Sequence, residues 1–366
     1  VSAENTQVPY PEFKINSEHF DFDIFWMSFT TLSRVAEWKI SLSGKQINSN
    51  SFNHPQADKI DFNRPFVNEC FAELERMIKL HFPHLKFGNG RGLQIDLSHD
   101  LDYLKKTLQL RIKQTAFNGF NLVRTLGQPK NFFPQLKKTS NFLLESRTYW
   151  CFDFWKELEE KANQRSTFYV YANAQVRSLK TWILDPSYNI SSNARLVEKL
   201  KSMHSEGFEI GLHGSFNSAE DFDLLKMEKD QLEDALGLEV SKTRQHWLRY
   251  NEQVTPRSHS ALFKFDSTIG WNDRMGFRAG IGSVYRPFDH ENQKPFDHFV
   301  IPLLIMDSNI YDYGAGDIQN QIAKGAQLLS GLKSVKNAHV SISWHPRTCS
   351  SDYNWHPAYE QYLRIA

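Results

Sequence analysis

Short apolar runs alternate with amphipathic segments over most of the chain. Seven runs of β type predict strands at residues 92–100, 166–172, 208–214, 243–248, 263–270, 298–307 and 339–346. Between several of them the apolar residues have helical spacing, as in 193–207 and 218–237, and both of these segments end at a glycine. Strand–helix–strand alternation is typical of a mainly parallel α/β sheet or barrel with its helices outside. In such folds the chemistry lies at the C-terminal ends of the strands.

Residues 1–90 follow a different pattern. Two apolar segments with helical character, 22–38 and 67–82, flank a polar, turn-rich loop, and a glycine-rich junction follows at 86–92. The first segment is dense in aromatic residues, which are costly to leave exposed. We therefore predict a smaller, helix-rich N-terminal accessory domain of residues 1–90, packed against a larger domain of residues 91–366.

The larger domain contains a basic insertion at residues 104–150. It holds nine lysines and arginines against one acid, Glu145. Such a segment is either a surface for an anionic glycan or a membrane, or the solvated side of one or two helices. We favour the solvated helices.

Composition indicates the compartment of the protein and the classes of partner it could bind. The chain has 366 residues and a net charge of +1, which gives no global electrostatic argument for nucleic acid. Three widely spaced cysteines favour a reducing compartment, so we expect a cytoplasmic protein. Export also stays open. The chain begins with Val1 rather than Met, as a processed or truncated N-terminus would. The longest apolar runs are too short for a transmembrane segment, and nothing in the sequence indicates an oligomeric state.

Side chains suited to catalysis or metal binding stand at the ends of four predicted strands. Asp100 and Asp102 end the first strand, and residues two apart in a strand face the same side. Two close carboxylates repel each other, so a cation or an arginine is expected beside them. The other strand ends carry, in chain order, His213 with Asn217, Arg244 with Arg249, and His345.

These residues, in this order, resemble the motifs of the polysaccharide deacetylase family (carbohydrate esterase family 4). The resemblance covers residues 91–366 and rests on SHDLDYL, EIGLHGSFN, TRQHWLRY and SISWHP. GFRAG at 276–280 and the aromatic N-terminal module are similar to a bacterial two-domain subgroup, which would bring Arg278 near the site. The resemblance implies a distorted (β/α)7-type barrel, related to the TIM barrel, in residues 91–366.

The resemblance also implies a role for each motif residue and a divalent metal, zinc before nickel or cobalt. Asp100 would be the catalytic base and His345 the general acid. The implied metal ligands are Asp102, His213 and Asn217; Arg244 would hold Asp100, the Trp247 backbone N–H would bind the oxyanion, and Trp271 falls in the fourth motif.

The sequence departs from the family pattern at two positions. Asn217 stands where a second histidine is usual, and an amide oxygen is a weaker zinc ligand than an imidazole. His246 replaces a proline, which leaves Arg249 as a rival to Arg244.

The implied function is a metal-dependent hydrolase that removes N-acetyl or O-acetyl groups from an acetylated glycan. A catalytically silent glycan-binding module is the main alternative. A metal-dependent hydrolase of other amides and a scaffold that binds partners through its N-terminal module are two more.

Overall fold

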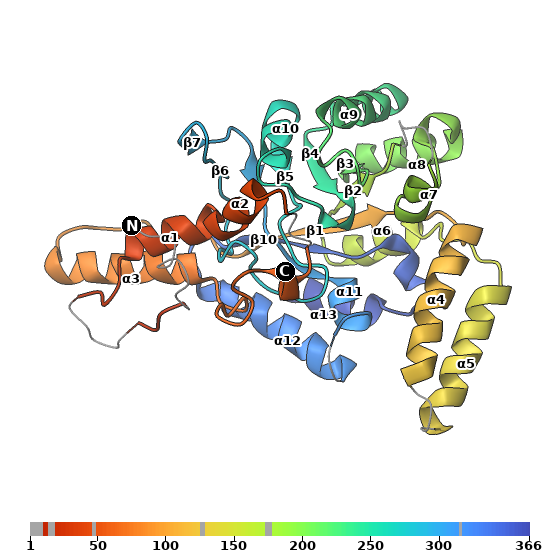
Figure 1. Ribbon diagram of the computed structural model, residues 1–366, viewed down its shortest axis with the longest axis horizontal. Helices are drawn as coiled ribbons and strands as arrows, with labels where there is room; N and C mark the ends of the chain where they lie inside the picture. Colours follow the sequence, from red (N-terminus) through yellow and green to blue (C-terminus); the bar gives the residue numbers. More distant parts are fainter. Residues whose placement is uncertain (1–9, 14–18, 46–48, 125–128, 173–177, 315–316) are drawn as a thin grey trace.

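The computed structural model describes residues 10–13, 19–45, 49–124, 129–172, 178–314 and 317–366. Within these residues, eight strands form one sheet in the order β8-β5-β4-β3-β2-β1-β10-β9 (Figure 1). Every neighbouring pair is parallel. The strands are β1 (Gln94–Leu101), β2 (Thr167–Val170), β3 (Glu209–Gly214), β4 (Lys242–Gln245), β5 (Phe265–Asp266), β8 (Phe299–Val300), β9 (Leu303–Met306) and β10 (His339–Ser343), with β6 (Phe288–Asp289) and β7 (Lys294–Pro295) as a separate antiparallel pair.

Helices cover the sheet, as the alternating pattern predicts. A loop follows β3, and a short 3-10 turn follows β4. The helices are α1 (Ile24–Leu32), α2 (Val35–Leu42), α3 (Phe66–His81), α4 (Leu108–Arg124), α5 (Pro129–Leu144), α6 (Phe152–Lys161), α7 (Leu179–Leu184), α8 (Ala194–Ser205), α9 (Phe222–Leu236), α10 (Thr255–Leu262), α11 (Asp307–Tyr311), α12 (Ile318–Gly331) and α13 (His356–Leu363), and the 3-10 turns are η2 (Ser51–Asn53), η3 (Ile190–Ser192), η4 (His246–Leu248), η5 (Leu332–Ser334) and η6 (Pro346–Cys349).

The sheet curls because its two outer strands are consecutive in the chain. β8 pairs with β5 at one edge, and β9 pairs with β10 at the other. Only Ile301 and Pro302 separate them, so the two edges of the sheet must meet at this corner. The Ile301 N–H donates to Asp266 O at 2.8 Å, and Pro302 O accepts from the Ser341 N–H at 2.8 Å. The predicted α/β barrel architecture is confirmed.

The same corner explains one difference from the predicted strands. Residues 298–307 form two strands rather than one, because Pro302 has no N–H to donate to a ladder. The predicted strand 243–248 also ends early, at Gln245. There η4 begins, with Trp247 in the left-handed region at φ 60°.

The N-terminal helices pack against the barrel. The predicted helix 22–38 is broken into α1 and α2 at Arg34, which takes φ 54°. The Val67 N–H of α3 donates to Gly280 O at 2.8 Å, and the Phe277 N–H donates to Phe62 O at 2.7 Å. Val67 shares a buried apolar cluster with barrel residues. The packing of this segment on the barrel is therefore observed, while the domain boundary near residue 90 stays a prediction.

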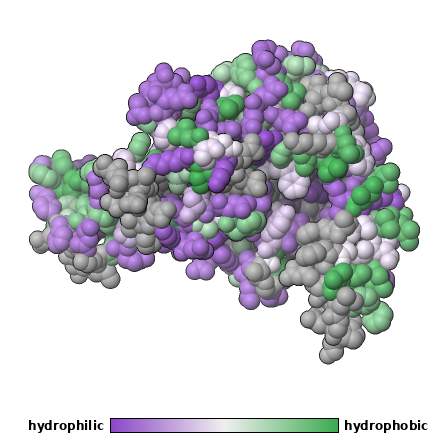
Figure 2. Space-filling model, viewed as in Figure 1, coloured by the Kyte–Doolittle hydropathy of each residue, from purple (hydrophilic) through white to green (hydrophobic). Residues whose placement is uncertain are grey.

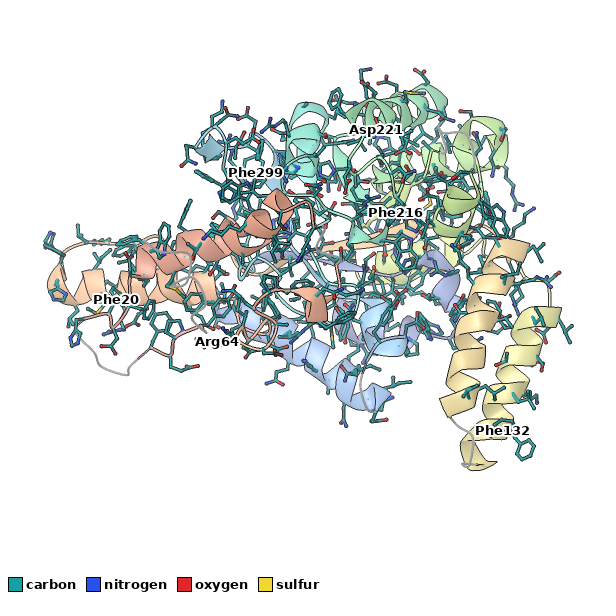
Figure 3. The ribbon with its side chains drawn as sticks, viewed as in Figure 1. Phe20, Arg64, Phe132, Phe216, Asp221 and Phe299 are labelled. Atoms are coloured by element: carbon teal, nitrogen blue, oxygen red, sulfur yellow. The ribbon has the colours of Figure 1, made fainter. Side chains whose placement is uncertain are left out.

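The basic insertion forms a hairpin of α4 and α5 that projects from the barrel, with Phe132 near its outer end (Figures 1 and 3). Four of its cationic side chains form contacts within the protein. Lys106 forms an ion pair with Asp352, and the other three donate hydrogen bonds to other residues, namely Arg111, Lys113 and Arg147. Apolar side chains are exposed over it (Figure 2), including Leu108, Ile112, Val123, Phe133, Leu136, Leu143 and Leu144. Among the described helices, none combines the length and apolar character that crossing a bilayer requires.

Candidate active site

A cavity of about 230 Å³ opens at the C-terminal ends of the parallel strands. Residues at or just beyond the ends of five strands, β1, β3, β4, β9 and β10, meet there, because parallel strands bring these ends to one side of the barrel. The lining includes Asp100, Asp102, Tyr103, Leu110, Lys113, Gln114, Leu184, His213, Gln245, His246, Trp247, Tyr313, His345 and Arg347. Most site residues predicted from the sequence therefore share one cavity.

Arg244 fixes Asp100 at the floor of the site. Its Nη1 donates to Asp100 Oδ1 at 2.7 Å, and its Nε donates to Ser267 O at 3.0 Å. Burial raises the pKa of Asp100, but the Arg244 guanidinium and neighbouring histidines outweigh burial and lower the pKa below its usual value. Arg249 instead pairs with Glu220 at 3.0 Å. The structure thus selects Arg244 over Arg249 as the partner of Asp100.

Two histidines face one oxygen of Asp102. Asp102 Oδ1 lies 3.4 Å from His213 Nε2 and 3.8 Å from His246 Nε2. The opposite nitrogen of each ring is held in place, because His213 Nδ1 lies 3.0 Å from Arg244 O and His246 Nδ1 lies 3.1 Å from Asp185 Oδ1. These contacts favour a proton on Nδ1, which leaves the Nε2 lone pair free to bind a metal. In metal sites, such a hydrogen bond to the other ring nitrogen fixes the tautomer and orientation of the histidine.

The donor set fits a divalent ion. The three ligand atoms lie within 4.8 Å of one another, and all three residues are buried. Asp102 Oδ1 and His213 Nε2 have no hydrogen-bond partner among the described residues, a costly arrangement unless a cation binds them. One carboxylate and two imidazoles also match the three protein ligands of a catalytic zinc with an open position.

The second oxygen of Asp102 has partners of its own. Asp102 Oδ2 accepts from Arg347 Nη1 at 2.8 Å and lies 3.3 Å from His345 Nε2. Burial raises the pKa of Asp102, yet the surrounding histidines and Arg347 bring the pKa well below its usual value. The carboxylate therefore stays ionised, as a metal ligand must.

Asn217 does not line the cavity, whereas His246 lines it and lies beside Asp102 and His213. The chain after β3 is held away from the site, because the Phe216 N–H donates to Asp185 Oδ1 and Phe216 O accepts from Arg249. The sequence did contain a signal for His246. It directly follows a strand, as the other site residues do. However, it was matched to the proline of the family's third motif, so it was not considered as a ligand.

His345 forms a dyad with Asp307, a residue that the sequence reasoning missed. His345 Nδ1 lies 2.8 Å from Asp307 Oδ1, and the His345 N–H donates to Asp307 Oδ2 at 2.9 Å. Burial lowers the pKa of His345, but Asp307 and Asp102 outweigh burial and raise the pKa above its usual value. The signal for Asp307 was its position at the end of the predicted strand 298–307.

The predicted tryptophans and Arg278 have different surroundings. Trp247 lines the cavity with a side chain that is 43% exposed. Trp271 is buried, and the Arg278 guanidinium lies over its ring at 4.8 Å. Arg278 pairs with Glu37 of α2 at 3.0 Å, so it joins the N-terminal helices to the barrel. The expectation that Arg278 lies at the site is wrong.

No family model and no curated protein matches this sequence. The fold is similar to several solved structures. A polysaccharide deacetylase from Mycobacterium smegmatis is 15% identical over 77% of this chain and 87% of its own, with a TM-score of 0.46. One from Bacillus cereus is 15% identical over 75% and 88%, with a TM-score of 0.35. A carbohydrate esterase family 4 pseudoenzyme from Bacillus anthracis is 11% identical over 76% and 62%, with a TM-score of 0.31.

Proposed function

We propose that this protein is a metal-dependent hydrolase that removes N-acetyl or O-acetyl groups from a carbohydrate. One observation carries the proposal. Asp102 Oδ1 and His213 Nε2 face each other at 3.4 Å, buried and without hydrogen-bond partners among the described residues. They line the same cavity as a carboxylate base, Asp100, and a histidine acid, His345.

Asp102, His213 and His246 would hold a divalent ion, which when bound polarises the acetyl carbonyl and lowers the pKa of a water molecule. Asp100 accepts the proton of the attacking water. Its lowered pKa keeps it ionised at neutral pH, and Arg244 fixes its orientation through Oδ1. The other carboxylate oxygen remains to receive the proton.

His345 completes the reaction on the leaving group. The new carbon–oxygen bond forms acetate while the carbon–nitrogen bond breaks, and His345 donates a proton to the departing amine. Its raised pKa favours the protonated form that a general acid needs. The Trp247 backbone N–H is proposed to stabilise the developing oxyanion, a contribution of roughly 3–4 kcal/mol for one such donor.

The wall of the cavity supports a sugar substrate. Trp247 and Tyr313 are 43% and 46% exposed, and both line the cavity. Lys113 of α4 also lines it, and burial lowers the pKa of its amine to about 8. Partly exposed rings beside a few polar groups are typical of pockets that bind small organic ligands.

The test is acetate release from N-acetylglucosamine oligosaccharides by zinc-loaded protein, compared with Asp100→Asn. We expect the variant to keep its catalytic zinc, because Asp100 is not a ligand, and to lose roughly 10²–10⁴-fold in kcat. Asp230→Asn on the exposed face of α9 is the matched control and should keep full turnover.

Turnover that survives Asp100→Asn would contradict the assigned base. Wild-type protein that binds zinc but releases no acetate from N-acetylated or O-acetylated sugars would instead favour the silent glycan-binding module.

A further inference from the structure

A second group of metal-binding side chains lies outside the catalytic cavity. It consists of His259 on α10, Asp266 at the end of β5 and His298 just before β8. The parallel pairing of β5 with β8 brings the last two together, since Phe265 is in register with Phe299, which Figure 3 labels. The side chains are 0%, 0% and 1% exposed, and none of the three lines the catalytic cavity.

Four atoms of this group have no hydrogen-bond partner among the described residues. They are His259 Nδ1, Asp266 Oδ2 and both ring nitrogens of His298. His259 Nδ1 lies 3.0 Å from Asp266 Oδ2, but the two atoms are not aligned as a hydrogen bond. The catalytic site shows the same arrangement of potential metal-ligand atoms. There, Asp102 Oδ1 and His213 Nε2 lie 3.4 Å apart, and neither has a hydrogen-bond partner among the described residues.

Hydrogen bonds to the other polar atoms of Asp266 and His259 leave Asp266 Oδ2 and His259 Nδ1 available to an ion. Asp266 Oδ1 accepts from the Thr268 N–H at 2.7 Å and from Thr268 Oγ at 2.5 Å, which leaves Oδ2 for another partner. The Gln245 amide lies 3.0 Å from His259 Nε2. A ligating histidine usually has a hydrogen-bond partner at its other nitrogen, and which end of the amide faces the ring is an assignment.

Charge gives the same indication. A carboxylate with no solvent exposure requires a compensating positive charge. In the described part of the chain, no lysine or arginine forms an ion pair with Asp266, and its ion-pair partner is His259. A divalent cation would supply the missing charge and satisfy the unpaired atoms together.

We propose that His259 Nδ1, Asp266 Oδ2 and one ring nitrogen of His298 bind a second divalent metal ion of the zinc class. The ligand atoms lie within 4.8 Å of one another. The three side chains are closed to solvent, so no substrate could reach a bound ion, and the ion would be structural rather than catalytic. Bound metal joins α10 to β5 and β8 at the barrel edge that closes against β9. It also orients His259 against Gln245, which lines the catalytic cavity.

Counting zinc in protein folded with zinc present tests this proposal. We expect about two equivalents per chain in the wild type, about one in His213→Ala and in His298→Leu, and almost none in the double variant. His298→Leu with the zinc content of the wild type would overturn the second site. If only the proposed catalytic zinc site were wrong, the result would differ. Zinc would then disappear in His298→Leu and persist in His213→Ala.

Stability provides a second readout with opposite signs. In a metal-free core, leucine in place of an unpartnered buried imidazole is neutral or stabilising. With a bound metal, His298→Leu lowers Tm in the presence of zinc, and chelation lowers Tm of the wild type more than Tm of the variant. If His298→Leu does not fold, anomalous scattering from crystals of the zinc-loaded wild type decides. A peak between His259 and His298 supports the proposal, and a peak at the catalytic cavity alone overturns it.

Discussion

At the residue scale, the proposed roles of the histidines depend on which ring nitrogen is already occupied by a hydrogen-bond partner. His213 and His246 both have Nδ1 engaged, by Arg244 O and by Asp185, so both present Nε2 to Asp102. His345 has Nδ1 engaged by Asp307 and also points Nε2 toward Asp102, but to the other oxygen. The two oxygens of Asp102 therefore separate the proposed metal side of the cavity from the acid side.

The third ligand can be tested by a pair of variants. We predict that His246→Ala loses the zinc of the catalytic site, because it removes one of three ligand atoms. Asn217→Ala should keep this zinc, because Asn217 does not line the cavity. Zinc per chain after dialysis measures both. The reverse result would restore Asn217 as the ligand predicted from the family pattern.

At the element scale, strand register brings His345, the proposed general acid, to Asp307. In the parallel pair of β9 and β10, Met306 is in register with Ser343. Asp307 directly follows Met306, and His345 follows Ser343 by two residues, so both lie just beyond the same end of the sheet, where Asp307 contacts His345. Asp100 and Arg244 come from β1 and β4, which are not neighbours in the sheet, and their contact at 2.7 Å depends on the curl of the barrel.

The Asp307–His345 dyad predicts a shift in the pH profile. With Asp307 present, the pKa of His345 is raised, and the acid loses its proton only above its usual range. Asp307→Asn removes the charge and leaves burial, which lowers the pKa. The alkaline limb of kcat/KM for acetate release should therefore move to lower pH. Asp312→Asn, which changes another carboxylate of the cavity lining, should leave this limb in place. An unchanged limb in Asp307→Asn would contradict the acid role of His345.

At the scale of the whole molecule, buried charges join the N-terminal helices to the barrel. Glu37 of α2 accepts from Arg278 Nη2 at 3.0 Å and also pairs with Arg34, whose guanidinium reaches Glu252. These side chains are almost entirely buried. Burial raises the pKa of Glu37, but Arg278 and Arg34 outweigh burial and hold the pKa far below its usual value.

Glu37→Gln should therefore be strongly destabilising. It leaves two buried guanidinium groups without their shared carboxylate, and we expect a loss of about 3–5 kcal/mol in the free energy of unfolding. Urea denaturation measures this loss. The partly exposed pair of Glu73 and Arg76 on α3 is the control, since Glu73→Gln should cost less than about 1 kcal/mol. Equal effects of the two substitutions would mean that the N-terminal helices do not depend on this network.

The sequence by itself determined the barrel and most of the candidate site. Alternating strands and helices indicate a parallel α/β fold because each element's periodicity is local, and polar residues at strand ends must share one side of such a barrel. Asp100, Asp102, His213 and His345 were found in this way. Only the tertiary structure placed His246 rather than Asn217 at the cavity, joined Asp100 to Arg244 rather than Arg249, and paired His345 with Asp307. It also revealed the His259, Asp266 and His298 group. Each of these choices depends on where a loop turns and on contacts between residues far apart in the chain, which no local pattern records.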